Sequence, residues 1–334
     1  MRYSPAFYEQ QAAGARRSAR AIVPIVLELV RPRSVVDVGC GTGTWLSVFA
    51  ELGVDDVLGV DGDWVELETL EIPRDRFLAH DLTQPLRVDR RFDLVVSLEV
   101  GEHLRDDAAP TYVETLAGLG AVVLFSAAIP FQRGQHHVNE QWPAYWADLF
   151  AGHDFVALDC IRRRIWTDDE VDWHYAQNVL LYAHRSERLA RAVESGDGVP
   201  LALVHPKKLA AELTRARELL PTVEDIAALV PAGDRFVLVD HEVFREDVAQ
   251  TRTALPFLER DGEYWGPPAD DETAISELER LRREGASFVV FGSPAFWWLD
   301  HYRGLAAHLR ERYPRVLDND RLIAFDLRDR DAPD

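Results

Sequence analysis

Short β-rich runs alternate with helical stretches between about residues 34 and 184, and this alternation limits the fold more than any other feature. The runs are SVVDVGC (34–40), VLGVD (57–61), RFLAHDL (76–82), FDLVVSL (92–98), AVVLFSAA (121–128), FVALDCI (155–161) and NVLLYAH (178–184). Strands that alternate with helices form a mostly parallel sheet, because each crossover helix packs on one of its faces. The sequence therefore predicts an α/β domain.

A second, shorter α/β pattern begins near residue 220, with RFVLVD as its first strand and AISELERLRREGA as a helix that ends at Gly285. A charged and largely helical stretch separates the two patterns. We therefore expect three parts. They are an α/β domain at 1–185, a helical connector at 186–219 and a smaller α/β domain at 220–334 that serves substrate recognition or oligomerisation.

The charge and the cysteine content exclude several classes of protein. The chain has 37 Lys and Arg against 57 Asp and Glu, a net charge of −20. Because nucleic acids and anionic membranes bind basic patches, we expect neither as a partner. Two cysteines, Cys40 and Cys160, do not form a disulfide framework, and the first residues have no apolar signal core. These features favour a cytoplasmic protein.

The first β-rich run leads into a glycine-rich turn, VVDVGCGTGTW at 35–45. Glycines between a strand and a helix let the backbone approach a ligand closely, and the helix offers its first amides. Asp61 ends the next run and is placed to accept hydrogen bonds from ribose hydroxyls. Asp81 ends the third run and is placed near an adenine amino group. The order of these signals predicts a nucleotide-like cofactor.

These signals resemble those of the class I S-adenosylmethionine (SAM) dependent methyltransferases, whose E/DxGxGxG loop appears here as Asp37-Val-Gly39-Cys-Gly41-Thr-Gly43. The resemblance covers about residues 30–185. It implies a Rossmann-like seven-stranded sheet with an antiparallel last strand, and SAM as cofactor. The cofactor-binding residues that we predict are Asp37, Gly39, Gly41, Asp61, Asp81, Leu82 and Ser97.

The stretch SLEVGEHL, residues 97–104, follows the fourth strand, whose carboxyl end faces the ligand in such a sheet. If a helix opens there, Glu99, Glu102 and His103 stand at i, i+3 and i+4 and share one face. Two carboxylates and an imidazole suit a divalent cation. Alternatively, these residues orient the loop without a metal.

A second histidine segment, AAIPFQRGQHHVNEQWPAYW at 127–146, follows the fifth strand and offers a fourth ligand. The combination resembles the metal-assisted O-methyltransferases of ubiquinone biosynthesis and those that methylate the terminal 2′-hydroxyl of small RNAs. The latter carry an H-x-x-E-W pattern, which His137-x-x-Glu140 matches with Trp142 displaced by one residue. The resemblance implies Mg²⁺ or Mn²⁺, with Fe²⁺ or Zn²⁺ as alternatives, and the ligands Glu99, Glu102, His103 and His137.

The function that we predict is O-methylation of a small sugar-like or secondary-metabolite acceptor, with Glu99, His136 and His137 as the catalytic residues. Neighbouring oxygens on the acceptor, as in a sugar diol or a catechol, suit a chelating cation. One alternative is metal-independent N- or O-methylation with a histidine base. Another is a non-catalytic SAM-binding scaffold in glycan assembly.

Roles for the remaining features are less specific. The segment from residue 136 to 184 resembles bacterial methyltransferases associated with glycan and secondary-metabolite assembly, which is the reason to prefer a sugar-like acceptor. Gln177 and Asn178 suit a pocket and the core equally. The C-terminal domain resembles one appended to bacterial glycosyltransferases and methyltransferases, and we expect that it also allows a homodimer.

Overall fold

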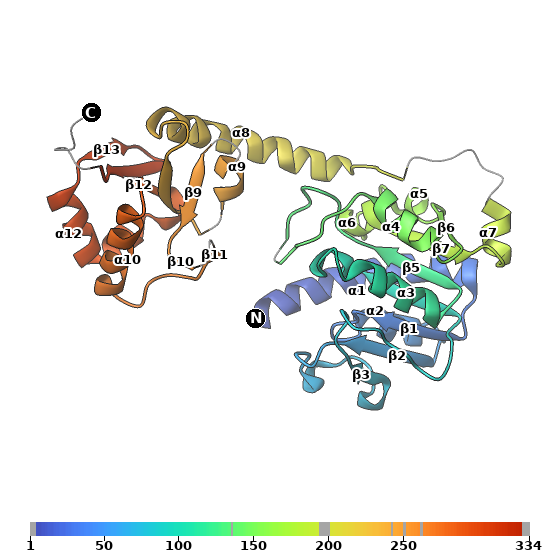
Figure 1. The fold of residues 1–334 in the computed structure, drawn as a ribbon. Coiled ribbons are helices and arrows are strands. Elements are labelled where there is room, and N and C mark those ends of the chain that lie inside the picture. The colour runs from blue at the N-terminus through green and yellow to red at the C-terminus, as the bar shows by residue number, and fades with distance from the viewer. Residues whose placement is uncertain are drawn as a thin grey trace. The chain divides into compact units, whose positions relative to one another are not determined.

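The computed structural model describes residues 5–134, 136–193, 201–241, 243–249, 252–260 and 263–328. The chain divides into two compact units, Met1–Ala210 and Ala211–Asp334 (Figure 1). This division falls inside the connector that the sequence predicts. Helix α8 (Pro206–Leu229) begins in the first unit and continues into the second.

The first unit is built on a seven-stranded sheet with the order β3-β2-β1-β4-β5-β7-β6. Strand β7 is antiparallel to both of its neighbours, whereas β1 to β5 are parallel. The predicted Rossmann-like sheet with an antiparallel last strand is therefore confirmed. The strands are β1 Ser34–Val38, β2 Asp56–Asp61, β3 Phe77–Ala79, β4 Leu94–Leu98, β5 Val122–Ser126, β6 Phe155–Leu158 and β7 Leu180–His184.

Helices cover both faces of this sheet because its strands are apolar on both sides. Side chains of α1, α2, α6 and α7 share one buried cluster with Val35 and Leu94, and those of α3 and α4 share the other with Val36 and Val95. The helices are α1 Pro5–Val30, α2 Thr44–Glu51, α3 Ala109–Leu119, α4 Pro143–Ala151, α5 Arg162–Ile165, α6 Trp173–Asn178 and α7 Arg188–Val193.

The strand order determines where a ligand binds. The chain leaves β1 toward β2 on one side, and it leaves β4 toward β5 on the other. In open α/β sheets, ligands bind beyond the carboxyl ends of the strands at such a change of direction. The glycine turn follows β1 and the Glu99–His103 segment follows β4, so both predicted parts of the site lie at this point.

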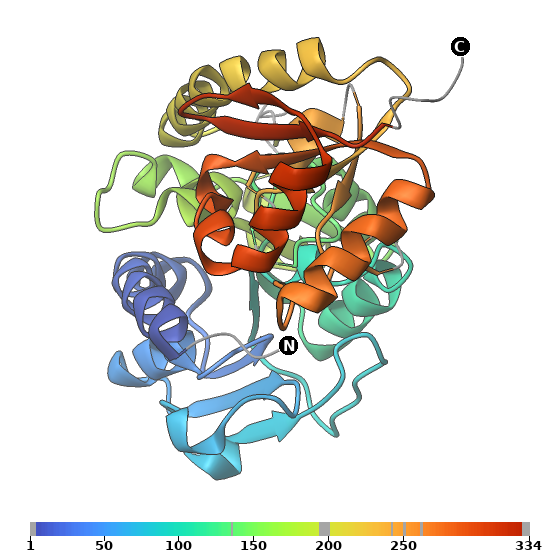
Figure 2. The same ribbon diagram turned by 90° about the vertical axis from the view of Figure 1, so that its left-hand side faces the viewer.

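The second unit is also an α/β unit, as the sequence predicts. Its five-stranded sheet has the order β13-β14-β12-β8-β9, with β8, β9 and β12 parallel. Helices α10 and α12 lie side by side on one face (Figure 2), and α8 and α9 pack on the other. The elements are β8 Arg235–Val239, α9 Arg245–Ala249, β9 Thr253–Pro256, β10 Glu259–Arg260, β11 Glu263–Tyr264, α10 Asp271–Arg283, β12 Ala286–Gly292, α11 Trp298–His301, α12 Arg303–Arg312, β13 Arg315–Asp318 and β14 Leu322–Asp326.

Within the described part of the chain, no helix is both long and apolar enough to span a membrane.

Candidate active site

The turn between β1 and α2 holds its three glycines in the left-handed backbone region. The φ angles of Gly39, Gly41 and Gly43 are 88°, 53° and 84°. A Cβ atom on Gly39 would lie 2.3 Å from Cγ2 of Val100, in the segment after β4. Glycine is therefore required here, because the turn that precedes α2 packs directly against the segment that carries Glu102.

Two buried carboxyl groups lie at this turn. Asp61 accepts hydrogen bonds from the N–H groups of Gly41 and Gly62, both at 2.7 Å, and each oxygen keeps a lone pair for a ribose hydroxyl. Burial raises the pKa of Asp61, while the two N–H donors lower it. Burial and the charge of Asp61 raise the pKa of Asp37 well above its usual value. A positively charged cofactor would relieve both effects.

The other predicted cofactor residues are held within the fold. Asp81 is exposed and its Oδ1 accepts from the N–H and hydroxyl of Thr83, which lower its pKa. Leu82 is buried in the core on the α3 side. Ser97 is buried, with its hydroxyl oxygen 2.5 Å from that of Tyr112. The hydroxyl of Ser97 is thus engaged in the core, and the cofactor roles of these residues stay predictions.

The helix that we expected to open at Glu99 is absent from this described segment. Glu99 has a φ of 55°, and its N–H donates to the carbonyl of Ser126 on β5 at 3.0 Å. This bond extends the pairing of β4 with β5 by one residue. Glu99 therefore belongs to the end of the strand and not to a helix. A single 3₁₀ turn follows at Gly101–His103, and the next helix is α3. Glu99 therefore does not share a helical face with Glu102 and His103.

Glu102 is fully buried, and neither of its carboxylate oxygens has a hydrogen-bond partner among the described residues. Burial, and then the charge of Glu99, raise its pKa well above the usual value. Its backbone carbonyl accepts from the N–H groups of Val138 and Asn139, which tie the loop after β5 to this turn. The backbone N–H groups of Glu102 and Ala128 partly offset the rise in its pKa, but neither carboxylate oxygen makes a well-formed hydrogen bond, which is unfavourable for a buried carboxyl. A cation would supply the missing partner.

His137 lies on the loop after β5 and His103 on the 3₁₀ turn, and each ring has an oxygen beside its Nδ1. Nδ1 of His137 is 2.9 Å from Oε1 of Glu140, and Nδ1 of His103 is 3.3 Å from the carbonyl of His136. Burial and the neighbouring His137 lower the pKa of His103, which favours a neutral ring. Oxygen partners at Nδ1 leave Nε2 of both rings available for a ligand.

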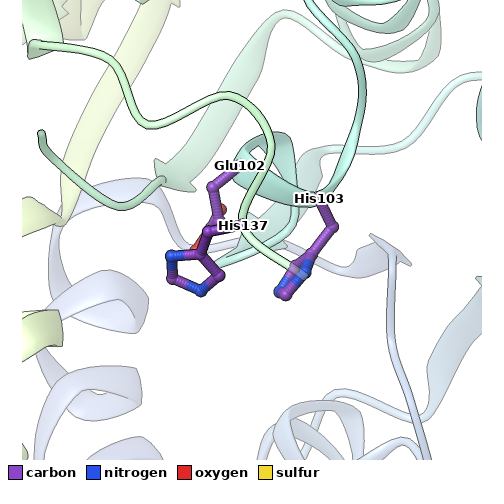
Figure 3. A group of neighbouring side chains, drawn as sticks. All are labelled: Glu102, His103 and His137. Carbon is purple, nitrogen blue, oxygen red and sulfur yellow. The ribbon is translucent and has the colours of Figure 1, made fainter. Parts of the chain in front are cut away.

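Glu102, His103 and His137 form one cluster, in which a possible ligand atom from each lies within 4.8 Å of the others. Figure 3 shows the three side chains meeting from the 3₁₀ turn and the loop after β5. The structure thus brings together three of the four predicted ligands. Glu99 is not in this group, and His136 is exposed. One carboxylate and two imidazoles suit Mn²⁺, Fe²⁺ or Zn²⁺ better than Mg²⁺, which prefers oxygen ligands.

A family model described as a methyltransferase domain matches residues 9–159. The matched residues include the glycine turn, Asp61, the 3₁₀ turn and His137. Residues 9–159 of the first unit form a methyltransferase domain. Among curated proteins, none matches the chain.

Solved structures that are similar to this chain include three proteins that align with about half of it. DesVI of Streptomyces venezuelae is 16% identical, with a TM-score of 0.42, over 55% of this chain and 100% of its own. The sugar N-methyltransferase KedS8 of Streptoalloteichus is 15% identical, with a TM-score of 0.43, over 55% and 93%. The methyltransferase domain of a bacterial CtHen1-CN is 18% identical, with a TM-score of 0.37, over 50% and 96%.

In this methyltransferase domain, two amide side chains hold the carboxylate of Glu99. Nε2 of Gln132 donates to Oε2 at 2.8 Å, and Nδ2 of Asn178 donates to Oε1 at 3.1 Å. Gln132 was not predicted from the sequence, because it is one of several polar residues in the loop after Pro130. Its role depends on a contact between residues 33 positions apart.

Proposed function

We propose that the methyltransferase domain transfers a methyl group from SAM to a hydroxyl of a small sugar-like or secondary-metabolite acceptor, with a divalent cation held by Glu102, His103 and His137. The observation that carries this proposal is the buried carboxyl of Glu102, whose oxygens have no partner among the described residues. It lies beside two imidazoles whose Nδ1 atoms already have oxygen partners. This donor set fits a cation and leaves few other roles for Glu102.

In this proposal, different residues bind the cofactor, hold the cation and accept the proton. SAM supplies an electrophilic methyl group, and Gly39, Gly41 and Asp61 form the turn on which it binds. A divalent cation held by Glu102, His103 and His137 would supply positive charge that lowers the pKa of an acceptor hydroxyl. His136 is exposed and precedes His137 in the chain, and we assign its imidazole the role of the base that takes the released proton. A sugar diol or a catechol presents oxygens in the arrangement that this site requires.

The metal is tested by titrating the full-length protein with Mn²⁺ in the presence of S-adenosylhomocysteine, and by measuring methyl transfer to a panel of sugar diols and catechols. We expect one Mn²⁺ per chain and loss of turnover with a chelator. Glu102→Gln should abolish Mn²⁺ binding and reduce turnover by about a thousandfold or more, with S-adenosylhomocysteine affinity retained. Glu114→Gln, at an exposed position of α3, is the matched control.

A second candidate function is metal-independent methylation with His103 as the general base. The lowered pKa of His103 favours a neutral imidazole at neutral pH, which is the form that accepts a proton. Under this candidate, a chelator leaves turnover unchanged, and Glu102→Gln has little effect. His103→Gln would then abolish turnover without any change in bound metal.

For the second unit we propose a role in acceptor recognition. Trp265 and Trp297 are 60% and 44% exposed, and exposed indoles pack on the apolar faces of sugar rings. Nε2 of His241 lies 3.3 Å from the indole nitrogen of Trp297, which limits its rotation. Trp297→Ala should raise KM for the acceptor without changing S-adenosylhomocysteine affinity. If these indoles instead form a homodimer interface, the variant will change the molar mass measured by light scattering.

A further inference from the structure

We propose that Lys208 and the backbone of His205, at the start of α8, belong to the machinery of the reaction centre, because they position the carboxylate of Glu99. This inference rests on the proposed function, because it takes Glu102, His103 and His137 as ligands of a cation and infers that Glu99 affects its binding. Both residues lie beyond the last strand of the sheet and outside the residues that match the methyltransferase family model. They are positioning residues, since they act through Gln132 and Gln177.

Three amide side chains form a closed hydrogen-bonded group behind Glu99. Oε1 of Gln132 accepts from Nδ2 of Asn178 at 2.9 Å and from Nε2 of Gln177 at 3.3 Å. Nε2 of Gln177 also donates to Oδ1 of Asn178 at 3.0 Å. With these acceptors occupied, the amide nitrogens of Gln132 and Asn178 point at Glu99. The three amides therefore determine how the carboxylate of Glu99 is oriented.

The start of α8 holds this group at two points. Nζ of Lys208 donates to the backbone carbonyl of Gln132 at 3.2 Å. The N–H of His205 donates to Oε1 of Gln177 at 2.8 Å. These bonds join positions 76 and 28 residues apart, so they connect separate parts of the first unit. Without these two bonds, the start of α8 no longer holds the loop that carries Gln132 and the helix that carries Gln177.

The segment that carries these residues is itself anchored. The imidazole of His205 lies 2.8 Å from the carbonyl of Trp166 through Nε2. Arg162, which is buried and forms an ion pair with Asp159 at 2.7 Å, donates to the carbonyl of Leu201 at 2.8 Å. A buried ion pair is weak evidence for stability by itself. Here it fixes the chain immediately before α8.

Lys208 is unusual for a lysine because only 5% of it is exposed. Its ammonium lies 5.8 Å from the centre of the Trp173 ring and donates to an uncharged carbonyl. Burying an ammonium is costly, and lysine is rarely buried in a core without a specific contact. The adjacent Lys207 is exposed and pairs with Asp169 at 2.8 Å. The two neighbouring lysines therefore form a matched pair, of which one contacts the loop behind Glu99.

The orientation of Glu99 matters because Glu99 immediately precedes the segment whose 3₁₀ turn, Gly101–His103, carries two of the three proposed ligands. Its hydrogen bond with Gln132 joins this segment to the loop after β5, which carries His137. If Glu99 rotates away, this link between the two segments that carry the proposed ligands is lost. Changes in groups that orient metal ligands typically reduce metal affinity about 10- to 100-fold.

The experiment compares Lys208→Met with Lys207→Met in the full-length protein, by Mn²⁺ titration in the presence of S-adenosylhomocysteine. We expect Lys208→Met to weaken Mn²⁺ binding about tenfold, and Lys207→Met to leave it within about twofold. Both variants should bind S-adenosylhomocysteine as the wild type does, because the hydrogen bond of Lys208 supports the loop after β5, whereas the glycine turn is held by the hydrogen bond between Gly41 and Asp61. Equal Mn²⁺ affinities for the two lysine variants would overturn the proposal.

A double-mutant cycle separates positioning from general destabilisation. If Lys208 acts through Glu99, Lys208→Met should have little further effect on Mn²⁺ affinity in a Glu99→Gln background. A purely structural role predicts the same loss of affinity in both backgrounds, which would also overturn the proposal.

Hydrogen exchange keeps this test separate from the test of the metal itself. In the protein without metal, Lys208→Met should increase amide exchange in residues 97–104 and 129–134, and Lys207→Met should not. If the wild type binds no Mn²⁺, the proposed function fails while this measurement still decides whether Lys208 supports Glu99. Unchanged exchange in both segments would refute the positioning role.

Discussion

Oε1 of Glu140 lies 2.9 Å from Nδ1 of His137 and also accepts the N–H of Arg133 at 2.6 Å. One carboxylate oxygen thus orients the imidazole and closes the loop after β5. Although burial raises the pKa of Glu140, these hydrogen bonds lower it below its usual value. A charged Glu140 favours a proton on Nδ1 of His137, and Nε2 then has the lone pair that a metal requires.

Glu140→Ala should therefore weaken Mn²⁺ binding about 10- to 100-fold while leaving S-adenosylhomocysteine affinity unchanged. Calorimetric titration of the full-length protein measures both affinities, with Glu114→Gln as the control. If Glu140→Ala binds Mn²⁺ as tightly as the wild type, His137 is not a ligand, or its orientation does not depend on Glu140.

Gly39→Ala should abolish cofactor binding for two independent reasons. The φ of 88° is unfavourable for alanine, and the added methyl would lie 2.3 Å from Val100. The backbone strain alone costs about 1–3 kcal/mol, so the turn must rearrange or the domain loses stability. Isothermal titration with S-adenosylhomocysteine and urea unfolding measure the two effects.

Gly118→Ala is the matched control for this substitution. Gly118 lies within α3, and a Cβ atom there meets nothing within 4 Å. Alanine should therefore stabilise the helix by about 1 kcal/mol. Equal losses of cofactor affinity in the two alanine variants would show that the glycine turn has no special role.

Tyr112→Phe should destabilise the methyltransferase domain without changing its cofactor affinity. The hydroxyl of Tyr112 lies 2.5 Å from that of Ser97 and donates to the carbonyl of Val38 at 3.1 Å, all within the core. Removing it leaves buried polar groups without a partner, which costs about 1–3 kcal/mol. A tenfold loss of S-adenosylhomocysteine affinity at unchanged stability would instead place Ser97 in the cofactor site.

The sequence predicted those features that depend on local patterns. Apolar runs of strand length and their helical separators were enough to predict the sheet of the first unit, since the central strands β1, β4 and β5 are buried on both faces. The glycines were identified because their backbone conformation excludes other residues. The proximity of His137 to Glu102 and His103 followed from the topology, because the loops after neighbouring parallel strands meet at one edge of the sheet.

The features that the sequence did not predict depend on tertiary contacts. The sequence predicted that Glu99 would share a helical face with Glu102 and His103 if a helix began there. In the structure its N–H pairs with β5, and the 3₁₀ turn begins only at Gly101. The carboxylate of Glu99 therefore accepts hydrogen bonds from Gln132 and Asn178. Lys208 could not be distinguished from Lys207, because both stand at the start of a charged helix. Only the packed structure shows that one ammonium is buried against the loop after β5 and the other is in solvent.

In the second unit, the contribution of Glu279 to the free energy of unfolding depends on pH. Its carboxylate accepts from the hydroxyl of Tyr313 at 2.5 Å, from Nε2 of His308 at 2.8 Å and from Nε of Arg282 at 3.0 Å. Burial opposes ionisation, but these donors lower the pKa of Glu279 from 4.5 to about 2. The folded state therefore binds this proton less readily than the unfolded chain.

Because the pKa is lower in the folded state, the contribution of Glu279 is complete above about pH 4.5 and is lost as the pH falls toward about 2. Glu279→Gln should reduce the free energy of unfolding at pH 7 by no more than about 2 kcal/mol, since solvent screens part of the interaction. Urea unfolding across pH 3 to 7 should show the difference between variant and wild type shrinking below about pH 4.5. Glu311→Gln, at an exposed position of α12, should show no such pH dependence. A constant difference for Glu279→Gln across this range would mean that the charge of Glu279 does not stabilise the unit.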